Sequence, residues 1–241
     1  DMRKRTSAIL WNYWEAMSQK LENIQACVFD AYGTLFDVNA AAAHCADELG
    51  DNWQILAEIW RGKQLSYTWL RTLMDEYVDF EAVTADALDY AMASLGIEDD
   101  GLRARLLALY LELDAYPEAA GVLGEVQAKG LKTAILSNGN PRMLEAATNH
   151  AGLANKLDAV ISVDAIRIYK PSSAVYQMAV DQLSCPAQSI CFMSSNAWDV
   201  AGAANFGFQV LWVNRFGQPA EQLPGKPAGE ITDLSGLLSW I

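Results

Sequence analysis

The sequence predicts an α/β fold, a doubly wound parallel sheet with a helical cap domain inserted after the first strand. In the second half of the chain, short apolar runs alternate with amphipathic stretches of helical spacing, which is typical of such sheets. Between the first apolar run and the second, about a hundred residues carry a helical pattern and no convincing strand. A helical insertion at this point would close over the carboxyl end of the sheet.

Five apolar runs of four or five residues are expected to be buried strands, because parallel strands covered on both faces have continuous apolar sequences. They are Ala26–Phe29, Thr133–Leu136, Ala159–Val163, Ile190–Met193 and Val210–Val213. Helices are expected between the later runs, at Leu144–Ala151, Val175–Leu183 and Val200–Phe206. Together these elements predict a Rossmann-like core.

Two features predict helix within the insertion. Residues 51–77 are rich in Trp, Leu, Arg and Glu. An apolar stripe with spacings of 4, 3 and 4, which follow one helical face, consists of Leu102, Leu106, Leu109 and Leu113. We expect a cap domain at residues 36–114 and a core domain made of residues 24–35 and 115–241.

Residues 1–23 are expected to form a separate N-terminal extension, which is helical. Leu10, Trp14, Met17 and Leu21 recur at i, i+4, i+7 and i+11, the spacing of one helical face. A helix that binds a membrane surface or a partner would show the same pattern. An accessory helix on the chain's own surface is the favoured interpretation.

Composition excludes several classes of function. Seventeen Lys+Arg against thirty Asp+Glu give a formal charge of −13, the wrong sign for binding nucleic acid. With only two histidines and no Cys-x-x-Cys pair, a zinc site is not expected. No apolar run approaches the ~18–20 residues of a membrane span, so no membrane association is expected. The four cysteines are expected to be free thiols in a reducing cytoplasm.

Polar residues follow the expected strands at their carboxyl ends, where ligands bind in open α/β sheets. Asp30 follows the first strand, Ser137-Asn138-Gly139 ends the second, and Ser194-Ser195-Asn196 ends the fourth. Lys170-Pro171 closes the loop after the third strand. A lone aspartate at a strand end is more often a helix cap or turn residue. The joint placement of these groups is what predicts one functional crevice.

Four ordered motifs resemble those of the haloacid dehalogenase superfamily. They are Asp30–Asp37 (DAYGTLFD), Ile135–Gly139 (ILSNG), Tyr169–Pro171 (YKP) and Phe192–Asp199 (FMSSNAWD), the last in the form found in L-2-haloacid dehalogenases. Trp60-Arg61 and the segment Gln64–Met74 (QLSYTWLRTLM) resemble the cap of that family. The resemblance extends from about residue 24 to the C-terminus. It implies cofactor-free and metal-free hydrolysis of short L-2-haloacids to D-2-hydroxy acids, with a 2-haloalkanoic acid as substrate, and it implies a homodimer.

The resemblance also assigns catalytic roles. Asp30 is the nucleophile that attacks the α-carbon and forms an ester. Lys170 favours its charged form and Thr34 orients it. Arg61 receives the departing halide with the help of Asn196. The water that hydrolyses the ester is positioned and activated by Ser194, Asn196 and Asp199.

The remaining assignments concern substrate binding. Ser137 and Asn138 hold the substrate carboxylate with backbone donors at a helix start. Tyr32 and Tyr176 either bound the active site or only pack in the core. By the same resemblance, the apolar pocket around the alkyl group of the substrate is expected to consist of Leu65, Phe80 and Trp198. Ala31 and Tyr32 are further expected substrate-binding residues.

Departures from the wider superfamily separate the possible reactions. Tyr32 stands where its phosphatases have a second aspartate, and Ser194, Ser195 and Asn196 stand where they have acidic metal ligands. Magnesium prefers carboxylates, so phosphate-ester hydrolysis is disfavoured. Gly62 replaces a larger polar residue, usually Gln, which leaves the accepted chain length open.

Two alternatives to the dehalogenase remain. A phosphatase or phosphonatase on the same fold is possible because fold alone does not determine function. A catalytically silent binding module is the other, although the intact Asp30, Arg61, Lys170 and Asp199 argue against it.

Overall fold

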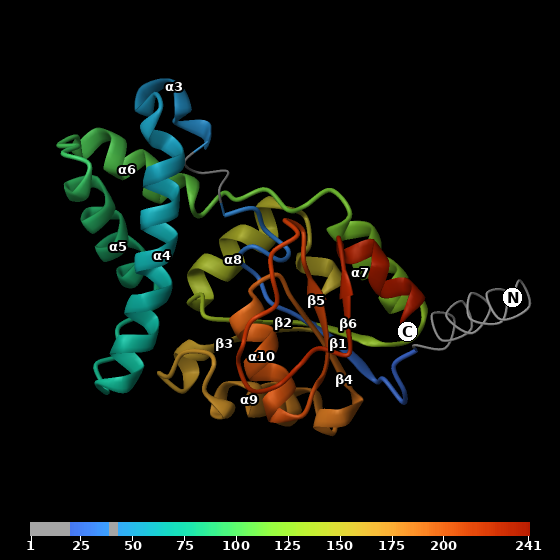
Figure 1. Ribbon diagram of the computed structural model, residues 1–241. Coiled ribbons are helices and arrows are strands. Elements are labelled where there is room, and N and C mark those ends of the chain that lie inside the picture. Colours follow the sequence, from blue (N-terminus) through green and yellow to red (C-terminus); the bar gives the residue numbers. More distant parts are fainter. Residues whose placement is uncertain (1–19, 39–42) are drawn as a thin grey trace, which may run out of the picture.

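The computed structural model describes residues 20–38 and 43–241, which are built around one parallel sheet (Figure 1). The sheet has six strands in the order β3-β2-β1-β4-β5-β6, and every neighbouring pair is parallel. The strands are β1 (Ala26–Phe29), β2 (Lys132–Ser137), β3 (Ala159–Ser162), β4 (Ile190–Ser194), β5 (Gln209–Val213) and β6 (Gly229–Ile231). The predicted doubly wound parallel sheet is confirmed.

Strand β1 lies in the middle of the sheet, where its apolar side chains are covered on both faces. All four of its residues are buried, and it pairs with β2 on one side and with β4 on the other. The chain moves outward from β1 to β3 and then returns to the opposite side of β1 at β4. At such a reversal the loops at the carboxyl ends of the strands diverge and leave a crevice for a ligand.

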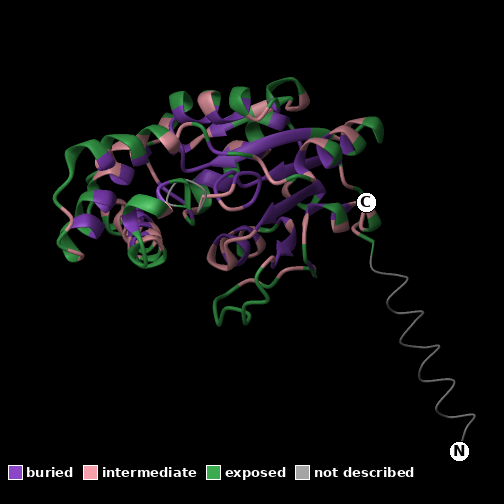
Figure 2. Ribbon diagram, turned by 90° about the horizontal axis from the view of Figure 1, so that it is seen from above, coloured by how far each residue is buried: buried purple, intermediate pink, exposed green. Residues whose placement is uncertain are grey.

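Four helices connect the strands, and they cover the two faces of the sheet. They are α7 (Ala119–Ala128), α8 (Pro141–His150), α9 (Ser173–Leu183) and α10 (Ala197–Phe206). Right-handed crossovers in this strand order place α7 and α8 on one face and α9 and α10 on the other. Figure 1 shows α9 and α10 next to each other, and Figure 2 shows buried residues concentrated along the strands while the outer turns of the helices are exposed.

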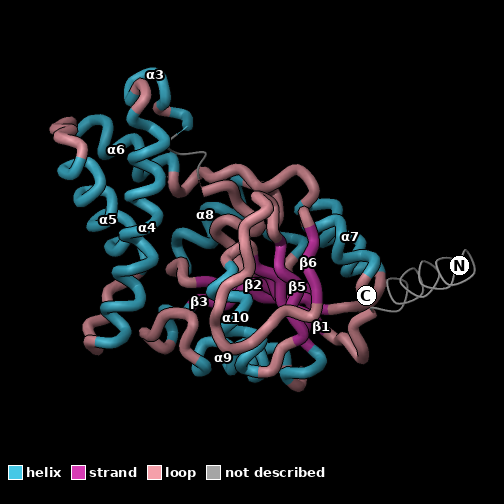
Figure 3. Tube along the Cα trace, viewed as in Figure 1, coloured by secondary structure: helices cyan, strands magenta, loops and turns pink. Residues whose placement is uncertain are grey.

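A helical segment joins β1 to the rest of the sheet. It contains α3 (Ala46–Leu49), α4 (Asn52–Leu73), α5 (Phe80–Ser94) and α6 (Asp100–Leu109). Figure 3 shows only helices and loops here, while the strands lie together in the other part of the molecule. Acidic caps define two of the helix starts: Asp79 accepts hydrogen bonds from the backbone of Glu81 and Ala82, and Asp99 accepts one from Leu102.

Some sequence-based expectations differ from the structure. The stripe from Leu102 to Leu113 is not one helix, because α6 ends at Leu109 and Leu113 lies in the loop that follows, where it is buried. Strand β6 was not expected, since it has only three residues and its central Glu230 is exposed at the sheet edge. Val163 belongs to a 3-10 turn, Val163–Ala165, rather than to β3.

The expected N-terminal helix lies almost wholly outside the described residues, because the described chain begins at residue 20. Among the helices of the described ranges, none is long and apolar enough to cross a membrane. The four cysteines, Cys27, Cys45, Cys185 and Cys191, are buried free thiols.

Candidate active site

Asp30 lies at the carboxyl end of β1, in the crevice that the strand order predicts. Its backbone N–H donates to the carbonyl of Met193 (2.9 Å), which continues the pairing of β1 with β4 past the end of the strand. The residue is 6% exposed. A carboxylate in this position is held by the strands and is almost fully shielded from solvent.

Four side chains donate to the Asp30 carboxylate. Its Oδ2 accepts hydrogen bonds from Asn196 Nδ2 (2.8 Å), Thr34 Oγ1 (3.1 Å) and Ser194 Oγ (3.4 Å). Its Oδ1 lies 3.1 Å from Lys170 Nζ. These are all residues that the sequence predicts for the site, and they come from the last residue of β4 and from the loops after β1, β3 and β4. The donors leave the carboxylate little freedom to rotate.

A buried ion pair and a tyrosine extend this network away from Asp30. Lys170 Nζ lies 2.8 Å from Asp199 Oδ2, and Tyr176 donates its hydroxyl to Asp199 Oδ1 (2.8 Å). The ammonium, the carboxylate and the ring are each almost inaccessible to solvent. Tyr176 therefore contacts a candidate catalytic residue and does more than fill the core.

Burial and charge act together on the pKa values of this network. Burial alone would lower the pKa of Lys170, but the carboxylates of Asp199 and Asp30 outweigh it and raise that pKa, which keeps the ammonium charged. Burial raises the pKa of Asp199, and the charge of Lys170 opposes this in part. Burial and the neighbouring Asp199 raise the pKa of Tyr176, so its hydroxyl remains a donor.

Arg61 reaches from α4 to the core residues of the site. Its Nη2 donates to Asn196 Oδ1 (3.2 Å) and to the carbonyl of Tyr32 (3.3 Å). Asn196 thus contacts both Arg61 and Asp30, and its amide bridges the cation and the carboxylate. An arginine held in this way is not an ordinary surface residue.

The end of β2 is also organised by its side chains. Ser137 Oγ accepts from the backbone of Gly139 (3.0 Å), and Asn138 Oδ1 accepts from the backbone of Lys170 (3.0 Å). Helix α8 starts just beyond, where Asn140 is the N-cap and its Oδ1 accepts a hydrogen bond from the backbone N–H of Met143 (2.8 Å). Backbone donors near a helix start form a natural place for an anion.

Aromatic side chains line the junction between the helical segment and the sheet. The ring of Tyr32 lies 5.5 Å from that of Phe80 and 5.6 Å from that of Tyr110. Its hydroxyl is buried and has no hydrogen-bond partner among the described residues. A β-carbon at Gly139 would lie 3.0 Å from this oxygen, so a glycine is needed for the close approach.

The other predicted pocket residues contact the site less directly. Trp198, after β4, meets Trp69 of α4 edge-on at 5.4 Å. Leu65 is half-buried on α4, one turn beyond Arg61. Ala31 is fully buried, and its carbonyl accepts from Leu35, which closes the turn that carries Thr34.

Sequence reasoning missed several supporting residues. Gln64, Thr84 and Tyr110 form a buried network around Arg61. Arg215 donates to the carbonyl of Thr34 (3.0 Å) and pairs with Glu118 (2.7 Å). Because Arg215 follows β5, its position near a strand end was a usable signal.

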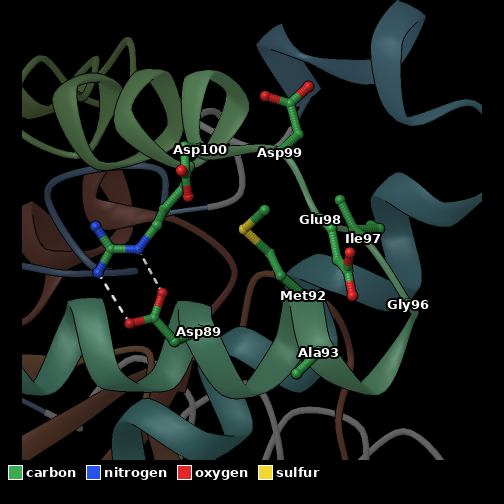
Figure 4. Close-up of a pocket in the computed structure, with 9 residues that line it drawn as sticks. Asp89, Met92, Ala93, Gly96, Ile97, Glu98, Asp99 and Asp100 are labelled. Atoms are coloured by element: carbon green, nitrogen blue, oxygen red, sulfur yellow. Dashed lines mark hydrogen bonds and ion pairs between the residues drawn. The ribbon is translucent and has the colours of Figure 1, made fainter.

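A hollow of about 420 Å³ lies on the helical segment, outside this site (Figure 4). It is lined by residues 89–103 of α5, α6 and their connection, and Arg103 there pairs with Asp89. It includes none of the residues predicted for catalysis. Within the described ranges, no cluster of three or more His, Cys, Asp or Glu side chains could hold a metal ion.

Comparison with known proteins agrees with this geometry. Residues 24–207 match the haloacid dehalogenase-like hydrolases. The chain belongs to this family. Within the family, (S)-2-haloacid dehalogenase 1 of Pseudomonas sp. (strain CBS-3) is 48% identical over 218 residues, covering 90% of this chain and 96% of that protein. The resemblance inferred from the motifs is confirmed.

Solved structures of the family extend the comparison. A crystal structure of a dehalogenase superposes with a TM-score of 0.90 at 44% identity, covering 91% of this chain and 98% of that one. The L-2-haloacid dehalogenase of Xanthobacter autotrophicus with chloropropionic acid covalently bound has a TM-score of 0.83 at 39% identity, covering 89% and 96% of the two chains.

Proposed function

We propose that this chain hydrolyses short L-2-haloacids to D-2-hydroxy acids through an ester on Asp30, with inversion at the α-carbon. The observation that carries the proposal is the bridge made by Asn196, which joins the Asp30 carboxylate to the Arg61 guanidinium. A nucleophile and a halide acceptor would then face the same carbon. The covalent chloropropionate complex of the Xanthobacter relative supports an ester of this kind.

In the first step, an oxygen of Asp30 attacks the α-carbon from the side opposite the halogen. The new C–O bond forms as the carbon–halogen bond breaks, and the halide leaves with the bonding electron pair towards Arg61 and Asn196. The substrate carboxylate is held by the backbone at Ser137 and Asn138. The hydroxyl of Tyr32, which lies close to Gly139 and has no hydrogen-bond partner in the described part of the chain, offers a further donor to this carboxylate.

In the second step, water attacks the carboxyl carbon of the Asp30 ester. Asp199 accepts the proton of this water, and Ser194 and Asn196 position it. The alkyl C–O bond stays intact while the acyl C–O bond breaks, and Asp199 returns its proton to the departing alkoxide oxygen, so the 2-hydroxy acid leaves. The remaining proton of the attacking water is lost from Asp30 to solvent, which regenerates the carboxylate. Lys170 lies between the two carboxylates, 3.1 and 2.8 Å from their oxygens, and its single positive charge offsets part of their negative charge in the resting enzyme.

We predict that Tyr176→Phe moves the acidic limb of the kcat–pH profile to higher pH. The tyrosine hydrogen bond lowers the pKa of Asp199, so its loss raises that pKa further. A base with a higher pKa is protonated sooner as the pH falls, and activity is lost earlier. Tyr169→Phe is the matched control, because that buried hydroxyl donates to the carbonyl of Val78 instead. An unchanged limb in Tyr176→Phe would contradict the role of Asp199 as the base.

We predict that a chelator leaves the rate of halide release from 2-chloropropionate unchanged. Tyr32 occupies the place of the second aspartate, and the loop after β4 offers Ser194 and Asn196 where magnesium would need carboxylates. Activity that is lost with chelator and restored by magnesium would favour a phosphatase or phosphonatase. No halide release from any haloacid would favour a silent binding module.

We also propose that the molecule is a homodimer. At the C-terminal end of α4, Leu70, Leu73 and the C-cap residue Met74 are 50%, 81% and 60% exposed, an apolar surface that a second copy could cover. Sedimentation at micromolar protein should give about twice the 26.4 kDa of the chain. A mass near 26.4 kDa would exclude the dimer.

We further propose that the chain is divided into two domains, a cap at residues 36–114 and a core made of residues 24–35 and 115–241. This division is supported by the absence of named strands between β1 and β2 in the described part of the chain.

We propose a cytoplasmic location, which the four buried free thiols support. The formal charge of −13 argues against binding of nucleic acid.

A further inference from the structure

Gln64 makes three side-chain hydrogen bonds beside Arg61. It lies on α4 and is 1% exposed. Its Oε1 accepts from Arg61 Nη1 (2.6 Å) and from the hydroxyl of Tyr110 (3.1 Å), and its Nε2 donates to Thr84 Oγ1 (2.7 Å). A buried amide with partners at both ends is rigid, because every alternative rotamer leaves a polar group without a partner.

We propose that Gln64 is a positioning residue that aims Arg61 at the departing halide. By holding Nη1, it leaves Nη2 directed at Asn196 and at the carbonyl of Tyr32, where the halide is received. This inference rests on the proposed dehalogenation. It concerns a residue that contacts neither the nucleophile nor the expected position of the substrate.

The orientation of the Gln64 amide follows from its neighbours. Thr84 donates its single hydroxyl proton to the carbonyl of Phe80 (2.6 Å), so its oxygen can only accept from Gln64. The nitrogen end of the amide must therefore face Thr84, and the oxygen end must face Arg61. Burial raises the pKa of Tyr110, so its hydroxyl remains protonated and donates to the same oxygen.

The neutrality of Gln64 matters as much as its geometry. A carboxylate in the same place would also accept from Arg61, but it would neutralise the guanidinium that the halide needs. An apolar side chain would leave the guanidinium of Arg61 held only through Nη2, with no acceptor for Nη1. A glutamine fixes the arginine and preserves its charge.

The test compares Gln64→Leu and Gln64→Glu with wild type. For Gln64→Leu we expect kcat to fall roughly ten- to hundredfold, with KM nearly unchanged. A misplaced Arg61 guanidinium slows the departure of the halide, whereas the substrate is still bound through its carboxylate. The loss should be larger with 2-chloropropionate than with 2-bromopropionate, because chloride is the poorer leaving group. Isothermal titration calorimetry should show that the Gln64→Glu enzyme binds bromide more weakly than the wild-type enzyme does.

Thr68→Val is the matched control, because Thr68 is equally buried on α4 and donates only to the carbonyl of Leu65. It should leave the chloride-to-bromide rate ratio and the bromide affinity unchanged. If Gln64→Leu does not fold, Tyr110→Phe removes one donor to the same amide and should move the ratio in the same direction.

Variants of Gln64 with wild-type rate ratios and bromide affinity would overturn the inference while the dehalogenase assignment stands. A wild-type protein that releases no halide but binds bromide through Gln64-dependent contacts would overturn the proposed function alone. If the wild-type enzyme itself binds no bromide, the positioning role of Gln64 is overturned.

Discussion

A single turnover in heavy-oxygen water, with enzyme in excess, should give largely unlabelled 2-hydroxy acid and place the label in the peptide that contains Asp30. The hydroxyl oxygen of the first product comes from the Asp30 carboxylate, because this oxygen forms the bond to the α-carbon. Solvent oxygen enters the protein when water attacks the carboxyl carbon. Later turnovers should then transfer the label to product, which mass spectrometry of peptide and product can follow.

Asp30→Ala should abolish both labelling and halide release, a loss on the order of 10⁴-fold or more, as is typical when a nucleophile is removed. The product from an L-2-haloacid should be the D-2-hydroxy acid, since attack opposite the halogen inverts the carbon. Fully labelled product in the first turnover would show direct attack by water. Asp30 would then be at most a general base.

The core strands could be predicted because their local sequence and their burial agree. β1 is confirmed residue for residue at Ala26–Phe29, and β5 differs by one residue from the expected Val210–Val213. Strand β6 could not be found in this way. A three-residue edge strand with an exposed Glu230 has no continuous apolar run, and it forms because β5 offers a free edge.

The carboxylate side of the candidate site could also be predicted, because strand ends bring Asp30 and Ser194 together once the sheet is known. The surroundings of Arg61 could not. Gln64 is three residues away in sequence, but its partners Thr84 and Tyr110 are 20 and 46 residues further on, in α5 and just after α6. Which helix faces meet is decided by tertiary packing, which no local pattern encodes.

Arg61→Ala should leave the fold intact and lower kcat by about 10²–10³-fold, the usual cost of removing one preorganised electrostatic group from an active site. The arginine is half-buried, and it donates across the junction to Asn196 and to the carbonyl of Tyr32. A halide that leaves in a space shielded from water needs such a cation. Arg61→Lys should recover only part of the rate, because an ammonium keeps the charge but loses the planar fork that contacts both partners.

Arg71→Ala is the matched control for this loss. Arg71 lies on the same helix, and its guanidinium pairs with Asp86 at the surface (2.9 Å), with 28% and 49% of the two side chains exposed. Since exposed ion pairs contribute little, this variant should keep the kcat of the wild type and nearly its thermal stability. Halide release by Arg61→Ala within a few-fold of wild type, with circular dichroism unchanged in both variants, would show that Arg61 does not receive the halide. A positive charge would then remain at Lys170, which contacts the carboxylate oxygen of Asp30 that Asn196 does not contact.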